Sequence, residues 1–142
     1  PSPEGEGAAR CMKMALRHAR LAPTDISYVN AHGTSTPQGD IAETQAIKTV
    51  FGDYSKKLAV SSTKGATGHM LGAAGATELI LCVKAIQTSI VPPTINLEKP
   101  DAECDLDYVP HTPREMPVNA IVNNSFGFGG HNATVIARKF NG

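Results

Sequence analysis

The 142 residues carry thirteen basic and thirteen acidic side chains, and this formal net charge of zero disfavours nucleic acid as a partner. No apolar run approaches the roughly 20 residues that a membrane helix needs, and the N-terminal residues are neither basic nor apolar as in a signal peptide, so we expect no membrane association. Cys11, Cys82 and Cys104 are odd in number and far apart, which disfavours a disulfide framework and predicts a reduced, cytoplasmic setting.

The chain begins with a predicted amphipathic helix over residues 7–21. Alanine, methionine and leucine alternate there with basic residues at helical spacing. Met12, Leu16 and Ala19 should form its buried stripe, and Pro23 should end it.

Two short strands and a second helix follow in the predicted order strand, helix, strand. Residues 26–31 and 58–61 have the apolar character of strands. Between them, Asp40 is expected to cap a helix over residues 41–51, with Gly52 closing it.

A third helix is predicted over residues 71–88, and its first turn has almost no side-chain bulk. Gly72 and Gly75 lie in that turn, which suggests close packing against backbone, because glycine costs up to about 1 kcal/mol in a helix relative to alanine. The rest is apolar nearly all round, as in a buried helix, and Pro92-Pro93 ends the unit.

Three more strands are predicted after this helix, over residues 105–109, 118–124 and 133–138. Residues 110–117, which begin and end with proline, should form a surface connection. Helices followed by strands in this manner predict an α/β layered fold.

Two histidines, His32 and His69, each follow a predicted strand within a glycine-punctuated loop, where catalytic groups are often found. Two neutral imidazoles can donate hydrogen bonds to one developing oxyanion. His69 is placed at the N-terminus of the third helix, where the helix dipole disfavours imidazolium, so we expect a neutral donor. Each histidine alone is more often a packing or capping residue than a catalyst.

Glu78 is the one charged residue between Met70 and Val83, on the predicted buried helix. A buried carboxylate needs a cation, and Lys64, at the end of the preceding strand, is the natural partner. The pair could simply hold the glycine loop or could orient His69, and we favour the second interpretation. If Lys64 is not the partner, a monovalent cation near Asn30 and Asn124 is the alternative.

Three other kinds of site are disfavoured. Ser61-Ser-Thr-Lys64 has the Ser-x-x-Lys spacing but lacks the companion motifs of that enzyme class. No glycine-rich nucleotide-binding motif is present. His32 and His69 have no third ligand at a metal spacing, so zinc is disfavoured.

Three segments, in this order, resemble the β-ketoacyl-acyl-carrier-protein synthases. They are Asn30-Ala-His-Gly-Thr-Ser-Thr36, the block from Ser61 to Gly75, and Asn124-Ser-Phe-Gly-Phe-Gly-Gly130. The resemblance runs from about Glu4 to Ile136. It implies the C-terminal half of a thiolase-like layered α/β/α/β/α sandwich, with a mixed five-stranded sheet that here lacks its first strand. By the family pattern we expect that strand to be central, and residues 1–142 to form one partial domain.

The same resemblance implies the chemistry of an elongating condensing enzyme. The two matched histidines would polarise the malonyl thioester carbonyl as carbon dioxide leaves, and Thr34 and Thr36 would line the pantetheine tunnel. Phe126 and Phe128 would lie on a glycine-hinged loop that gates the acyl pocket, although both could simply be core residues on a tight turn. The implied partners are acyl- and malonyl-loaded acyl carrier protein and a second subunit in a homodimer, with no cofactor.

The family reaction also needs a nucleophilic cysteine, and none of the three cysteines matches it. We therefore expect a fragment that is inactive alone and supplies the His-His-Lys portion of a fatty-acid-elongating β-ketoacyl-acyl-carrier-protein synthase. A polyketide ketosynthase is a close alternative. A non-catalytic chain-length-factor or scaffold homologue is another, but it would be free to lose His32, His69 or Lys64.

Overall fold

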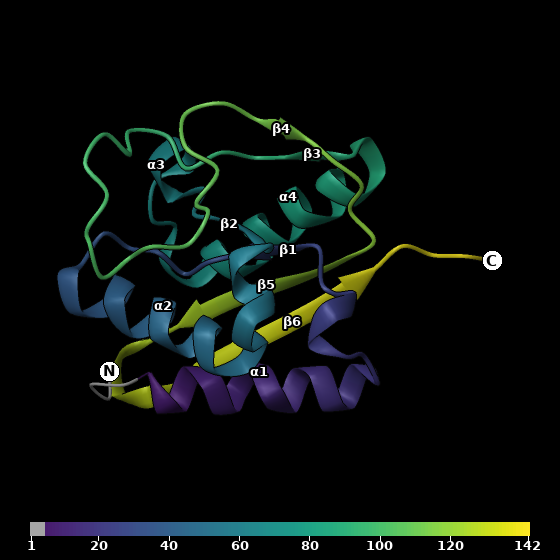
Figure 1. The fold of residues 1–142 in the computed structure, drawn as a ribbon, viewed down its shortest axis with the longest axis horizontal. Helices are drawn as coiled ribbons and strands as arrows, with labels where there is room; N and C mark the ends of the chain where they lie inside the picture. Colours follow the sequence, from purple (N-terminus) through teal and green to yellow (C-terminus); the bar gives the residue numbers. More distant parts are fainter. Residues whose placement is uncertain (1–4) are drawn as a thin grey trace.

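The computed structural model describes residues 5–142, and it has the expected α/β architecture (Figure 1). A four-stranded mixed sheet lies between two helical layers. Its strand order is β2-β1-β5-β6, and β6 runs antiparallel to the other three strands. The strands are β1 (Tyr28–Asn30), β2 (Ala59–Ser61), β5 (Ala120–Phe126) and β6 (Asn132–Arg138).

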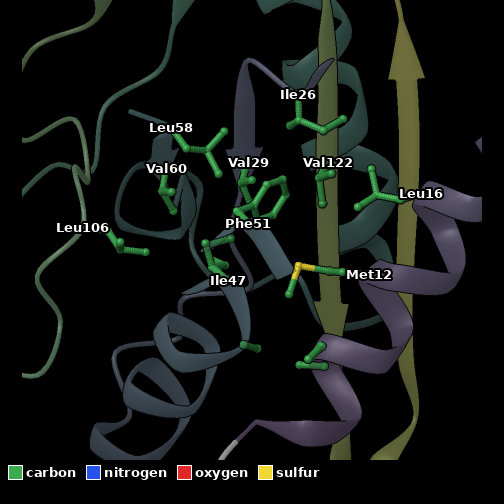
Figure 2. Close-up of a cluster of buried hydrophobic side chains, with 14 of the residues drawn as sticks. Met12, Leu16, Ile26, Val29, Ile47, Phe51, Leu58, Val60, Leu106 and Val122 are labelled. Atoms are coloured by element: carbon green, nitrogen blue, oxygen red, sulfur yellow. The ribbon is translucent and has the colours of Figure 1, made fainter. Parts of the chain in front are cut away.

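Helices α1 (Glu6–Ala19) and α2 (Pro37–Phe51) cover one face of this sheet. Their apolar residues meet the side chains that the strands direct to that face, as Figure 2 shows. Met12 and Leu16 are buried as the helical spacing predicts, whereas Ala19 is only partly buried. The labelled members of this core are Met12, Leu16, Ile26, Val29, Ile47, Phe51, Leu58, Val60, Leu106 and Val122.

Helix α4 (Ala74–Thr88) covers the opposite face. Cys82 and Ala85 pack there with Tyr28 of β1 and Ile121 of β5. The next residue along each of these strands points to the other face and belongs to the core under α1 and α2. This alternation follows from the two-residue period of a strand. The one-turn helix α3 (Lys64–Thr67) and a 3₁₀ turn (Leu71–Ala73) connect β2 to α4.

Strands β1 and β2 end at the same level, and β5 continues past that level to Phe126, which places the segments that follow β1 and β2 beside the end of β5. Asn30, the last residue of β1, pairs with Ser61 at the end of β2 and with Asn123 in β5. The loop with His32 leaves β1, and the segment with Lys64 and His69 leaves β2. Sheet register therefore determines where the candidate site forms.

The expected position of the missing strand is wrong. Strand β1 is hydrogen-bonded directly to β5 along Tyr28–Asn30, so no strand fits between them in the centre of the sheet. Any additional strand must join at an edge, because β2 and β6 are the outer strands of the described sheet.

The strand predicted over residues 105–109 is also absent. One isolated bridge, between Ala59 and Asp107, is all that remains of it. The carboxylate of Asp107 accepts a hydrogen bond from the Val109 N–H and pairs with Arg114, and Val109 has a positive φ of 47°. These local contacts turn the segment away from an extended ladder. Two short strands that were not predicted, β3 (Ile90–Val91) and β4 (Arg114–Glu115), pair with each other.

Asp40 does not cap the second helix, because α2 begins earlier, at Pro37. Proline is well suited to the first helical position, since its fixed φ matches the helix and it has no N–H that needs a partner. Thr36 is the residue before it, and its side chain makes no capping hydrogen bond. Gly52 ends the helix at a positive φ of 56°, as expected.

Helix α4 is not buried all round in this chain. Ala74, Glu78, Cys82 and Ala85 face the sheet, whereas Ile80 is 62% exposed on the other side. Nor do the two glycines lie against backbone: a Cβ on Gly72 would meet nothing within 4 Å, and one on Gly75 would make an ordinary 3.8 Å contact with Ser125. The small, apolar outer face of α4 therefore remains uncovered among the described residues.

Candidate active site

The structure brings His32 and His69 together. Their ring centroids are 5.7 Å apart, and the rings are nearly perpendicular, at 86°. Phe126, at the end of β5, lies against His32 with ring centroids 5.9 Å apart. Three segments that are distant in the sequence thus meet at one end of the sheet. Two imidazoles at this separation can both contact the same small group.

A backbone hydrogen bond assigns the proton of His69. The N–H of Leu71 donates to Nδ1 of His69 over 3.1 Å, so Nδ1 must be unprotonated and the neutral ring carries its proton on Nε2. His69 does not lie at the N-terminus of α4 as predicted, because the 3₁₀ turn Leu71–Ala73 separates it from that helix. One local hydrogen bond thus leaves Nε2 as the nitrogen of His69 that can donate.

His32 is kept neutral by its surroundings. Burial is the main cause that lowers its pKa to about 4, and the charge of Lys64 and the proximity of His69 lower it further. The unfolded chain would take up a proton near the ordinary pKa of 6.5. His32 therefore contributes stability that is fully present above pH 6.5 and is lost as the pH falls from 6.5 toward 4.

Glu43, which the sequence interpretation missed, holds the backbone of the His32 loop. Its two carboxylate oxygens accept hydrogen bonds from the N–H groups of His32 and Gly33, both over 2.9 Å, and the side-chain amide of Asn124 donates to Oε1 over 3.3 Å. Burial raises the pKa of Glu43, and these three donors oppose that rise. The signal in the sequence was the helical spacing that puts Glu43 on the same face as the apolar residues Ala46 and Ile47.

Gly33 is required by the shape of this loop. Its φ is +38°, and a Cβ there would lie 2.6 Å from Cβ of Ser62, closer than real contacts allow. The Ser62 hydroxyl donates to the Gly33 carbonyl over 2.7 Å. The His32 loop is therefore fixed from two sides, by Glu43 on α2 and by Ser62 after β2.

The ion pair predicted between Lys64 and Glu78 is present. Nζ of Lys64 lies 2.6 Å from Oε1 of Glu78, and the two side chains are only 6% and 2% exposed. The pair joins the start of α3 to α4, the two elements between which His69 lies. It therefore anchors both ends of the segment that carries His69.

The four predicted substrate-binding residues do not gather equally around the histidines. Phe126 packs against His32, whereas Phe128 is fully exposed. The hydroxyls of Thr34 and Thr36 lie 3.3 Å from each other. The gating and tunnel-lining roles of these residues remain predictions.

No metal centre is evident in residues 5–142, where His, Cys, Asp and Glu side chains form no group of three that could hold an ion. The buried side-chain atoms that lack a hydrogen-bond partner nevertheless include three oxygens of Asn30, Glu78 and Asn123, namely Oδ1, Oε2 and Oδ1 respectively. Carboxylate and amide oxygens are suitable ligands for a hard cation, so these three residues are the ones that could hold such an ion.

None of the described cysteines is an activated nucleophile. Cys82 is buried on α4, and burial raises its thiol pKa to about 12. Burial also raises the thiol pKa of Cys104. Cys11 lies on α1, which contributes no residue to the histidine site.

Residues 1–98 match the family profile described as "Beta-ketoacyl synthase, C-terminal domain". The chain belongs to the β-ketoacyl synthase family. It is 58% identical over 139 residues to 3-oxoacyl-[acyl-carrier-protein] synthase 2 of Coxiella burnetii (strain RSA 493 / Nine Mile phase I), covering 98% of this chain and 34% of that protein. The enzyme of the same name from Synechocystis sp. (strain ATCC 27184 / PCC 6803 / Kazusa) is 53% identical over 140 residues, with 99% and 34% covered.

Solved structures of β-ketoacyl synthases have the same fold as this chain. A type II polyketide ketosynthase in complex with its acyl carrier protein, AntDE:AntF, superposes with a TM-score of 0.95 at 39% identity, over 98% of this chain and 34% of that one. A β-ketoacyl synthase from Burkholderia phymatum STM815 has a TM-score of 0.91 at 39% identity with the same coverage. The chain thus spans about a third of the length of these relatives.

We expect the change Lys64→Ala to destabilise the protein by about 3–5 kcal/mol, because it leaves Glu78 buried without its cation. Adding Glu78→Gln removes the stranded charge and should restore part of the stability. Urea denaturation of both variants measures this, with Lys84→Ala, an exposed lysine on α4, as the matched control. A double variant no more stable than Lys64→Ala would mean that the two residues are not partners.

The change Glu43→Gln should destabilise the protein by about 1–3 kcal/mol, because the amide nitrogen would face a backbone N–H and leave it unsatisfied. It should also increase amide hydrogen exchange at His32 and Gly33, which lose their acceptor. Glu115→Gln, on the exposed strand β4, is the control. Unchanged exchange at both amides would show that Glu43 does not hold the loop.

Proposed function

We propose that this chain forms the histidine-bearing part of a 3-oxoacyl-acyl-carrier-protein synthase that elongates fatty acids. The observation that carries the proposal is the convergence of His32 and His69 as two neutral imidazoles. Identity of 58% to a 3-oxoacyl-[acyl-carrier-protein] synthase 2 supports the reaction class.

In the proposed reaction, a malonyl thioester lies with its carbonyl oxygen between the two histidines. The bond between the α-carbon and the carboxylate breaks, carbon dioxide leaves, and the electron pair moves onto the thioester oxygen as an enolate. Nε2–H of His69 and an N–H of His32 donate hydrogen bonds to this oxygen. Preorganised donors of this kind act on charge that develops in the transition state.

The α-carbon then attacks an acyl thioester on a cysteine. A carbon–carbon bond forms, the acyl–sulfur bond breaks and the cysteine leaves as thiolate. We propose that this cysteine belongs to the part of the relatives' length that the present chain does not span, since Cys82 and Cys104 have raised pKa values. Lys64 and Glu78 act as positioning residues for His69.

The substrates proposed here are malonyl and acyl groups carried by acyl carrier protein. A similar structure holds such a carrier in complex with its ketosynthase, which supports the partner class. Thr34 and Thr36 would bind the pantetheine arm, and Phe126 and Phe128 would contact the acyl chain. We further propose a homodimeric, cytoplasmic enzyme in which residues 1–142 form one partial domain. No helix among residues 5–142 has both the length and the apolar character needed to cross a membrane.

A polyketide ketosynthase is the second candidate, favoured by the TM-score of 0.95 to the AntDE:AntF complex. Sequence identity is lower there, at 39% against 58% for the fatty-acid enzyme, and we therefore favour fatty-acid elongation. We disfavour a non-catalytic scaffold, because both histidines and the Lys64–Glu78 pair are in place.

In the whole enzyme, His32→Ala and His69→Ala should each lower malonyl decarboxylation by about 10²–10³, because each removes one donor to the oxyanion. Transfer of an acyl group to the cysteine should persist, since these donors serve the malonyl carbonyl. Release of labelled carbon dioxide and acyl-enzyme mass measure the two steps separately.

The matched control for these variants is His18→Ala, an exposed histidine on α1. Near-normal decarboxylation in both active-site variants would contradict the proposal. Equal loss of acyl transfer and decarboxylation would also contradict it, because the histidines would then not act selectively on the malonyl group.

A further inference from the structure

A cavity of about 500 Å³ lies behind the His32 loop, between α2 and the segment from Thr94 to Tyr108. Its volume is within the range of small-molecule sites in proteins. Apolar and polar side chains both line the cavity, and the apolar ones include Val60 of β2 and Ile47 of α2. The reaction proposed above makes no use of this space.

The cavity is distinct from the histidine site. It is lined by Gly33, Ser35 and Pro37, whereas the side chains assigned to the pantetheine arm, Thr34 and Thr36, do not line it. His32, His69 and Phe126 are likewise absent from its walls. The loop therefore presents one side to the candidate active site and the other to the cavity.

Acidic side chains outnumber basic ones in the wall of the cavity. Asp40, Glu43 and Asp101 line it, against a single cation, Lys99. The carboxylate of Glu43 is already held by the loop N–H groups. The Asp40 carboxyl has a backbone hydrogen bond from Ser35, but its Oδ1 is buried with no hydrogen-bond partner; burial raises the pKa of this carboxyl, and the Ser35 hydrogen bond opposes that rise. A cationic group close to Asp40 would compensate this desolvated carboxylate.

We propose that this cavity binds a small, largely apolar molecule with one primary ammonium group, whose apolar body packs on Ile47 and Val60 and whose ammonium pairs with Asp40. The apolar lining provides the affinity for the body of the ligand. The carboxylates provide the preference for a cation over a neutral or anionic head group. A carboxylate of the same shape should be rejected by Asp40 and Asp101.

Cys104 provides a direct reporter of occupancy, because its thiol lies in the cavity wall and is partly exposed. Cys11 is also partly exposed, but it lies on α1, away from the cavity, and so serves as an internal control. A bound ligand should slow alkylation of Cys104 and leave alkylation of Cys11 unchanged.

The experiment measures iodoacetamide labelling of each cysteine by peptide mass spectrometry in the whole protein at pH 7. The probes are cyclohexylmethylamine, cyclohexylmethanol and cyclohexanecarboxylate, which share a ring but differ in charge. We expect saturable protection of Cys104 by the amine, at a concentration about tenfold lower than for the alcohol, and no protection by the carboxylate. Asp40→Asn should remove the preference for the amine over the alcohol, and Ile41→Trp, which fills the cavity, should remove protection by either.

Three results would overturn the proposal. The first is no saturable protection of Cys104 in the unsubstituted protein, a result that needs no variant to fold. The second is equal slowing at Cys104 and Cys11, which would indicate a general effect of the amine. The third is a preference for the amine that survives Asp40→Asn. The outcome is independent of the condensation reaction, because labelling of Cys104 does not require turnover.

Discussion

The site depends on one constraint, the shared register of the three parallel strands β1, β2 and β5. Because Asn30 pairs with both Ser61 and Asn123, β1 and β2 end beside each other while β5 continues to Phe126, and the segments that follow β1 and β2 meet the end of β5 at one edge of the sheet. This edge is where polar loop residues of an α/β protein typically form a ligand site. A shift of one residue in β1 would direct Asn30 and the loop after it to the wrong face.

Buried charges then convert this arrangement of loops into fixed donors. On one side of the sheet, the Glu43 carboxylate binds the backbone of the His32 loop, and on the other, the Lys64–Glu78 pair anchors the segment of His69. Buried ionic groups are costly, and they are retained where their loss would leave a partner unsatisfied. The charge of Lys64 also helps burial to lower the pKa of His32, so the residue paired with Glu78 affects the other histidine as well.

Much of the site was predictable because it lies in local motifs, whereas the misses involve contacts between distant segments. The two histidine loops and the Lys64–Glu78 pair follow from short patterns and from the rule that a buried charge needs a partner. Glu43 was missed because nothing in its own helix shows that two loop N–H groups point at it. The prediction of a strand over residues 105–109 was wrong because Asp107 and Arg114 pair locally. The prediction that α4 is buried all round was wrong because the apolar character of a helix does not reveal what covers each of its faces.

The central claim is that two neutral imidazoles, with Nε2 of His69 as a donor, face one position. Nitrogen-15 NMR of the whole protein labelled at histidine tests this directly, because it reports protonation and tautomer for each ring. The account predicts that His32 stays neutral from pH 8 to pH 5 and titrates near its pKa of about 4, while His69 shows an acceptor-type Nδ1 and a protonated Nε2. Titration of His32 at or above 6.5, or a proton on Nδ1 of neutral His69, would contradict it.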